Sequence, residues 1–264
     1  MASRGRLVCR GCRHQASVTA GTIFQDTRTP LRVWFRAVWY VTSQKNGTSA
    51  ANIQRILGLG SYQTAWTWLH KLRRAMVRPG RDKLHGRVEV DETFLQGEDS
   101  QGLWLPRKAA IVIAAEEDGR GIGRIRLARI PSPTKAVLHD FARATIEPGS
   151  FVHTDGLQAW KGLKQLGYRH KQTVLLGKKD LDAASRLLPR VHRVASLLKR
   201  WLLGTHQGAV EPVHLDYYLD EFTFRFNRRT SRSRGKLFYR LLQQAVEIRP
   251  TTYRQMIGGK AQEE

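Results

Sequence analysis

Three β-rich runs that follow one another from residue 86 to residue 130 restrict the fold more than any other feature of this chain. They are RVEVDETFLQG, KAAIVIAAEED and GIGRIRLARI, with glycine near the joins, as is typical of an antiparallel meander. The helical pattern PSPTKAVLHDFARATI follows, and the apolar run in SFVHTDG predicts a short strand that ends at Asp155. This order predicts an α/β layered fold around a mixed sheet.

The segments that follow complete a ribonuclease-H-like sheet flanked by helices, which we assign to residues 84–210. LQAWKGLKQLG is predicted to be a helix, and residues 168–188 a strand and a loop. PRVHRVASLLKRWLLG is predicted to be a helix with Pro189 in its first turn and Gly204 beyond its end. Residues 211–264 are expected to form a C-terminal helical, basic region.

Residues 31–80 are predicted to form an N-terminal helical bundle that contains a helix-turn-helix. The first helix begins after Pro30. Ser49 and Ser61 can cap two further helices on either side of a Gly-Leu-Gly break. The core of the first helix is expected to consist of its large apolar residues, namely Trp34, Phe35, Val38 and Trp39.

The third helix of this bundle has two distinct faces. Apolar residues recur at three- and four-residue steps at Tyr62, Trp66, Leu69, Leu72 and Met76. The opposite face is polar and basic, with Gln63, Thr64, Thr67, Lys71 and Arg74. This pattern is that of a DNA-reading helix, although many helical hairpins share it and bind nothing.

The net charge favours the DNA-binding alternative. The chain carries 45 Lys and Arg against 22 Asp and Glu, a formal charge of +23. A positive field of this size favours a polyanion partner and salt-dependent binding. The segment RFNRRTSRSRGK, with Arg225, Arg228 and Arg229, is expected to contact phosphates, or else to be a solvated run.

No apolar run reaches the roughly 18 residues of a membrane span, and no signal peptide is evident. We therefore expect a cytoplasmic protein with no membrane partner. Cys9 and Cys12, in C-R-G-C, have the spacing of half a zinc site. His14 could supply a third ligand, but nothing nearby supplies a convincing fourth, so a metal-free, poorly ordered N-terminus is expected. Residues 1–30 are assigned as the remnant of a zinc-ribbon-like N-terminus.

Two acids lie where predicted strands would bring them together. In VEVDETF, Val88 and Val90 share one face of the strand and Glu89 and Asp91 the other. Asp155 follows the short apolar strand in VHTDG. Either acid alone would be an ordinary turn or surface residue. As a pair on adjacent strands they would form a site for a hard cation such as Mg²⁺.

The helix that begins at Pro189 presents a polar face suited to the same site. His192 and Lys199 are seven residues apart, close to two helical turns, so they share a face with the small residues Ala195 and Ser196 between them. The other face is apolar and is expected to dock on the sheet through Val191, Val194, Leu198, Trp201 and Leu202.

Together these segments resemble insertion-sequence transposases of the DDE superfamily, in the ISXO-like group. The similarity covers nearly the whole chain and is carried by VEVDETFLQG, VHTDG and LKRWLLGTHQGAVEPVHLDYYLDEFTFRFNRR. It implies a catalytic site of Asp91, Asp155 and His192, with Lys199 seven residues after the third ligand. In such enzymes, two ions about 3.5–4 Å apart catalyse phosphodiester cleavage and joining.

Two positions depart from the family pattern. His192 stands where the family usually has Glu, and an imidazole suits Mn²⁺ better than Mg²⁺. Only Cys9 and Cys12 remain of the usual zinc ribbon, which makes bound Zn²⁺ doubtful. The resemblance implies that the partners are the element's terminal repeats and target DNA, bound by a homo-oligomer. It also implies a bacterial protein that is associated with the nucleoid. The alternatives are a DNA-binding protein that has lost catalysis and a nuclease that cuts without joining; Glu221 is the substitute acid if His192 plays no part.

Overall fold

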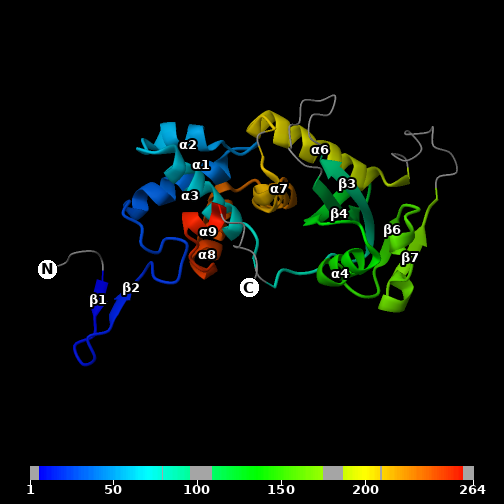
Figure 1. Ribbon diagram of the computed structural model, residues 1–264, viewed down its shortest axis with the longest axis horizontal. Coiled ribbons are helices and arrows are strands. Elements are labelled where there is room, and N and C mark those ends of the chain that lie inside the picture. Colours follow the sequence, from blue (N-terminus) through cyan, green and yellow to red (C-terminus); the bar gives the residue numbers. More distant parts are fainter. Residues whose placement is uncertain (1–5, 79, 96–108, 175–186, 209, 258–264) are drawn as a thin grey trace. The chain divides into compact units, whose positions relative to one another are not determined.

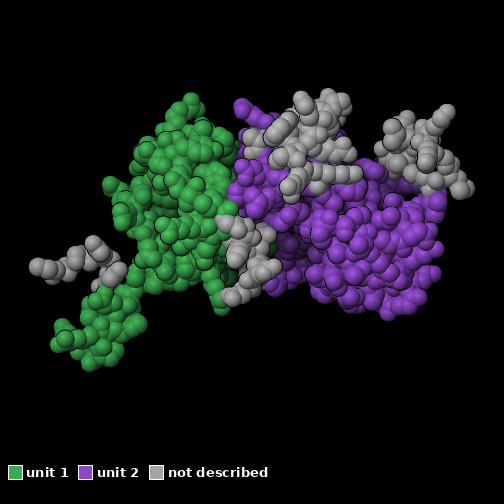
Figure 2. Space-filling model, viewed as in Figure 1, with its two compact units in different colours: residues 1–78, 231–264 green, residues 79–230 purple. Residues whose placement is uncertain are grey.

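The computed structural model describes residues 6–78, 80–95, 109–174, 187–208 and 210–257 of the chain (Figure 1). The described residues belong to two compact units, coloured separately in Figure 2. Unit 1 comprises residues 1–78 and 231–264, and unit 2 comprises residues 79–230. Among the described residues, no helix is both long and apolar enough to cross a membrane.

Unit 1 is mainly helical. A short two-stranded antiparallel sheet, β1 (Arg6–Val8) and β2 (Gln15–Ser17), precedes α1 (Leu31–Ser43), α2 (Ala50–Leu57) and α3 (Tyr62–Ala75). The C-terminal segment adds α8 (Arg234–Glu247), which packs on α1 and α3, and α9 (Tyr253–Ile257). Ser49 and Ser61 cap α2 and α3 as predicted, because each side chain accepts a bond from an N–H of the first turn.

Half of the predicted core of α1 is wrong. Trp34 and Val38 are almost fully buried, and Trp34 stacks on Trp68 with ring centroids 3.7 Å apart. Phe35 and Trp39, however, are 41% and 48% exposed. The buried positions 34, 37, 38 and 41 follow the helical period, and residues 35 and 39 lie about 100° further around the helix.

The predicted division of α3 into two faces is also only partly correct. Leu69, Leu72 and Met76 are buried as expected, but Tyr62 is 55% exposed. The second half of α3 is covered on several sides, so that His70 and Arg73 are buried as well. The first turn of α3 therefore carries its exposed polar surface.

Unit 2 contains a five-stranded mixed sheet in the order β5-β4-β3-β6-β7. Strands β3 (Arg87–Leu95), β4 (Ala109–Asp118) and β5 (Gly121–Ile130) form the predicted antiparallel meander. β6 (Phe151–Thr154) and β7 (Arg169–Gln172) add to the β3 edge as parallel strands. The part of the predicted strand and loop from residue 175 to residue 186 lies outside the described residues.

Helices cover both faces of this sheet (Figure 1). On one face, α6 (Pro189–His206) and α7 (Leu215–Asn227), which follows the short turn η3 (Pro212–His214), pack on β3, β4 and β5. On the other, α4 (Lys135–Thr145) covers a core that contains Val88, Val90 and Trp160. The apolar face predicted for residues 189–203 is confirmed, since Val191, Val194, Leu198 and Leu202 are buried and Trp201 packs beside them.

Three segments differ from the sequence predictions. LQAWKGLKQLG forms two 3₁₀ turns, η1 (Gln158–Trp160) and η2 (Leu163–Leu166), because Gly162 at φ 105° interrupts the helix. α6 runs past Gly204 and ends at Gln207, which takes the left-handed conformation. Residues 211–264 are divided between the units, since α7 packs on β5 and α8 packs on α1.

Candidate active site

The register of two parallel strands brings the two predicted acids together. Val88 pairs with Val152 and Val90 with Thr154, so that Asp91 on β3 and Asp155 at the end of β6 occupy the next equivalent positions. Asp155 leaves the sheet there, and its Oδ1 accepts the backbone N–H of Leu157 at 3.0 Å. The predicted approach of these carboxylates on adjacent strands is confirmed.

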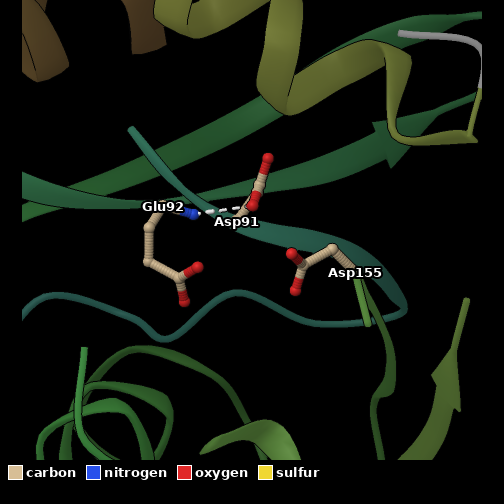
Figure 3. A group of neighbouring side chains, drawn as sticks. All are labelled: Asp91, Glu92 and Asp155. Carbon is tan, nitrogen blue, oxygen red and sulfur yellow. Dashed lines mark hydrogen bonds between the residues drawn. The ribbon is translucent and has the colours of Figure 1, made fainter. Parts of the chain in front are cut away.

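A third acid, Glu92, completes the cluster. Ligand oxygens of Asp91, Glu92 and Asp155 all lie within 4.8 Å of one another. Asp91 and Glu92 leave β3 on opposite sides, as consecutive strand residues do, and the Asp155 carboxylate reaches toward β3 between them (Figure 3). The backbone N–H of Glu92 donates to Asp91 Oδ1 at 2.8 Å, which fixes the first carboxylate.

Burial and neighbouring carboxylates disfavour the anionic forms of Asp91 and Glu92. Burial and then the nearby Asp155 raise the pKa of Asp91 to about 7. Burial, followed by Asp91 and Asp155, raises the pKa of Glu92 to about 8. Among the described residues, Glu92 Oε1 is also buried without a hydrogen bond of good geometry, although the Trp160 side chain is near enough to lower the Glu92 pKa in part. Such an oxygen costs free energy unless a cation or donor satisfies it.

These features fit a divalent metal ion. Hard cations such as Mg²⁺ and Mn²⁺ take oxygen ligands, and carboxylates are their usual protein ligands. Asp91, Glu92 and Asp155 could therefore hold a metal. A bound cation would offset the repulsion that raises the pKa values of Asp91 and Glu92.

His192 lies next to the acids, on the first turns of α6. Its Nε2 is 3.7 Å from Asp91 Oδ2, and its side chain is 36% exposed. The same residues line a small cavity of about 130 Å³, which Asp91, Thr154, Asp155, Thr173, Leu187, Leu188 and His192 enclose. The structure thus places the expected third residue at the site, at a distance too long for a hydrogen bond.

A buried glutamate on β3 holds the start of α6 in place. Glu89 is 2% exposed, and its Oε2 accepts the backbone N–H groups of Arg190 at 2.7 Å and Val191 at 3.1 Å. Its Oε1 accepts the Arg190 guanidinium at 2.8 Å. Glu89 and Asp91 share a face of β3, and these bonds come one and two residues before His192. Glu89 therefore sets where His192 lies relative to Asp91.

Lys199 lies seven residues after His192 on α6 and is partly buried. Seven residues advance an α-helix by about 10 Å along its axis. Glu221, the alternative acid, is almost fully buried on α7 and pairs with Arg225 at 2.7 Å.

Comparison with known proteins identifies the family of this fold and site. Residues 83–227, more than half of the chain, match the ISXO2-like transposase domain. The chain belongs to this transposase family. It is also 25% identical, over 248 residues, to an uncharacterised protein in the transposable element ISH50 of Halobacterium salinarum. That alignment covers 88% of this chain and 81% of the relative.

Solved structures with a low level of similarity include that of a viral assembly. It is the cryo-electron microscopy structure of a simian T-cell lymphotropic virus intasome in complex with the PP2A regulatory subunit B56 gamma. The match has 14% sequence identity and a TM-score of 0.36, and it covers 76% of this chain and 74% of that chain.

The residues of this transposase that were predicted to read DNA differ in accessibility. Gln63 is exposed at the start of α3, and Thr64 is partly exposed. The Thr67 hydroxyl donates to the Gln63 carbonyl of its own helix at 2.7 Å. Lys71 donates to the carbonyl of Ile23 at 3.2 Å, and Arg74 donates to Thr251 Oγ1. Within the described part of the chain, Gln63 and Thr64 in the first turn of α3 are the predicted side chains of this helix for which no such internal bond is seen.

The arginines near the end of α7 that were predicted to contact phosphates interact with other residues of unit 2. Arg225 pairs with Glu221, and the Arg228 guanidinium lies 4.2 Å from the centroid of the Phe224 ring. Arg229 lies 4.1 Å from the Phe226 ring and donates to the carbonyls of Ile122 and Gly123. These bonds hold the guanidinium groups in place, so any phosphate they contact would meet a preformed surface.

The two cysteines of the transposase are exposed free thiols at the turn between β1 and β2. The Cys9 N–H donates to the His14 carbonyl at 2.8 Å, so the turn is closed by backbone bonds. Hydrogen bonds, the largest from the Cys12 backbone, lower the pKa of the Cys9 thiol. The antiparallel pairing of β1 and β2 on either side of the cysteines was not predicted from the sequence.

Proposed function

We propose that the chain is a DDE-type transposase that cleaves DNA at the ends of its insertion element and transfers the 3′-OH strand to target DNA. The observation that carries the proposal is the cluster of Asp91, Glu92 and Asp155 beside His192, in a chain of the ISXO2-like transposase family. The close approach of the ligand oxygens of these three acids supports an intact site over a decayed one.

Asp91, Glu92 and Asp155 would hold divalent metal, Mg²⁺ or Mn²⁺. When bound, two ions would activate the attacking oxygen and stabilise the leaving oxygen of an in-line displacement. Glu92 would supply the third carboxylate that is missing from the position of His192. His192 would complete the site beside Asp91 or orient the attacking oxygen there. Lys199 would contact a phosphate further along α6.

Two successive displacements give the overall reaction. Water attacks the phosphorus at the element end, the bond to the 3′ oxygen breaks, and a free 3′-OH and a 5′-phosphate result. That 3′-OH then attacks a phosphodiester of the target, forming a new bond and releasing a target 3′-OH. Each step exchanges or hydrolyses one phosphodiester, so no nucleotide triphosphate is needed.

Substrate binding would combine both units, each copy acting within a homo-oligomer assembled on DNA. The exposed first turn of α3, with Gln63 and Thr64, would contact the terminal repeats, and Thr67, Lys71 and Arg74 would support that helix. The charge of +23 and the arginines at the end of α7 support general contacts with phosphates.

The test is to incubate the full chain with duplex DNA that carries the ends of its element, in Mn²⁺ and in Mg²⁺. Cleavage and joining together are expected. Binding alone would indicate a protein that has lost catalysis, and cleavage without joining would indicate a nuclease.

Matched variants connect the reaction to the site. Asp91→Asn, Glu92→Gln and Asp155→Asn should each reduce cleavage by roughly 100-fold or more, because each removes a metal ligand. Asp140→Asn is the control, since Asp140 is an exposed acid on α4 whose side chain pairs with Arg143. If Glu92→Gln cleaved DNA at the wild-type rate, Glu92 would not be a metal ligand, and His192 would be the third ligand.

A further inference from the structure

A groove on unit 1 has no part in the chemistry described above. It has a volume of about 510 Å³ and lies among α1, α2 and α8. Its lining combines five apolar or aromatic residues with two arginines and a tyrosine. These residues are Phe35, Trp39, Ile56, Leu57, Phe238, Arg32, Arg36 and Tyr40.

The aromatic rings of this groove are exposed rather than packed. Trp39 is 48% exposed and Phe35 is 41% exposed, and Trp39 meets Phe238 edge-on at 5.8 Å. Exposed apolar groups that cluster in a groove indicate a binding surface. The free energy of leaving two large rings in water is recovered only when a ligand covers them.

The sequence of α1 interleaves these rings with cations. Arg32, Phe35, Arg36 and Trp39 follow one another at steps of three, one and three residues, which places all four on one side of the helix. Among the described residues, none that lines the groove is acidic. A ligand that stacks on rings and carries negative charge fits this arrangement.

The charge of unit 1 is consistent with such a ligand. The sequence of residues 1–78 and 231–264 contains 20 Lys and Arg against four Asp and Glu. Two copies of so basic a unit repel one another, which disfavours a second copy as the occupant. A polyanion with flat apolar faces, which is an unpaired nucleic-acid strand, combines both requirements.

We propose that this groove binds unpaired nucleotides of DNA, with a base stacked on Trp39 or Phe35 and the flanking phosphates at Arg32 and Arg36. A paired duplex keeps its base faces inside the stack, so the groove would distinguish unpaired from paired DNA. The assignment to DNA rather than RNA rests on the proposed function. Stacking of one base on such a ring strengthens binding by roughly ten-fold or more.

The experiment measures binding of the full chain to a fluorescent oligothymidine by anisotropy, beside a duplex of equal length. EDTA is present throughout, so that failure here is distinguishable from failure of metal-dependent cleavage. Trp39→Ala should weaken binding of oligothymidine by about ten-fold and of duplex by less than about two-fold. The control is Tyr239→Ala, because Tyr239 is 63% exposed on α8 and does not line the groove.

Two further measurements keep the proposal falsifiable. If Trp39→Ala does not fold, Arg36→Glu replaces it as the test variant, because Arg36 is exposed. Arg36→Glu should weaken binding of oligothymidine. Photocrosslinking of wild-type protein to 4-thiothymidine DNA should label residues 32–40, and labelling confined to other segments would overturn the proposal. Equal losses for Trp39→Ala and Tyr239→Ala would do the same. The proposal would also be overturned if wild-type protein bound an RNA strand more tightly than oligothymidine. It would be overturned too if the wild-type protein were a dimer that Trp39→Ala dissociates.

Discussion

Glu89 offers the sharpest test of how the fold positions the active site. Glu89→Gln keeps the size of the side chain but removes its charge. An amide has one oxygen and one NH₂ group, so one end of the new side chain would present donors to the donors of Arg190 and Val191. In the native protein all three bonds to the carboxylate are 2.7–3.1 Å long, and the carboxylate is buried.

The magnitude follows from these contacts. Breaking a buried ion pair by removing one partner costs about 3–5 kcal/mol. Arg190 keeps other partners, because it also contacts Glu117 at 3.1 Å and donates to the carbonyls of Gly119 and Gly121. We therefore expect the free energy of unfolding to fall by about 2–3 kcal/mol, which is closer to the cost of losing charge-assisted hydrogen bonds. This loss lowers the midpoint of thermal unfolding by about 4–10 °C.

The assay compares thermal unfolding in EDTA with DNA cleavage at a temperature well below the midpoint. Glu117→Gln is the control, since its carboxylate is 24% exposed and its pairs with Arg87 and Arg190 are worth at most about 1 kcal/mol. If Glu89 positions His192, cleavage by Glu89→Gln should fall several-fold while the protein is still folded. A midpoint no lower than that of Glu117→Gln would refute the reasoning.

Three more predictions follow from the site and the sheet. In EDTA at pH 8, Asp91→Asn should raise the free energy of unfolding by on the order of 1–3 kcal/mol, because it removes a buried anion whose pKa is raised to about 7. In a separate measurement without EDTA, the thermal stabilisation of the wild-type protein by Mn²⁺ should be absent in Asp91→Asn. Burial raises the pKa of Glu116, but bonds from the Arg124 side chain and from the His85 and Arg124 N–H groups outweigh it, so the pKa is lowered from 4.5. Ionised Glu116 therefore stabilises the folded protein at neutral pH, and this stabilisation is lost as the pH falls through the lowered pKa. Denaturant titrations should show that Glu116→Gln has a lower free energy of unfolding than the wild type at pH 7, and that this free energy falls less on acidification. His192→Ala should abolish cleavage but preserve folding and DNA binding, whereas His192→Glu should retain some cleavage and favour Mg²⁺; wild-type rates for His192→Ala would remove it from the site.

Much of the fold could be predicted from the sequence because its determinants are local. Alternation over VEVDETF assigns Glu89 and Asp91 to one face of β3, and helical periodicity assigns the buried face of α6. Ser49 and Ser61 mark helix starts through bonds to their own first turns. Such features depend on residues within a few positions of one another, so a single sequence contains the information.

The rest depends on contacts between distant segments. Glu92 follows Asp91 and should point away from it, yet it joins the cluster because β6 ends beside it and Asp155 reaches toward β3. The bonds from Glu89 to Arg190 join residues 101 positions apart. In the same way, α8 packs on α1 and leaves Phe35 and Trp39 exposed, although their apolar character predicts burial. Periodicity shows which side of an element is apolar, but the packing of other elements decides which of its residues are covered, and that packing is fixed by the whole chain.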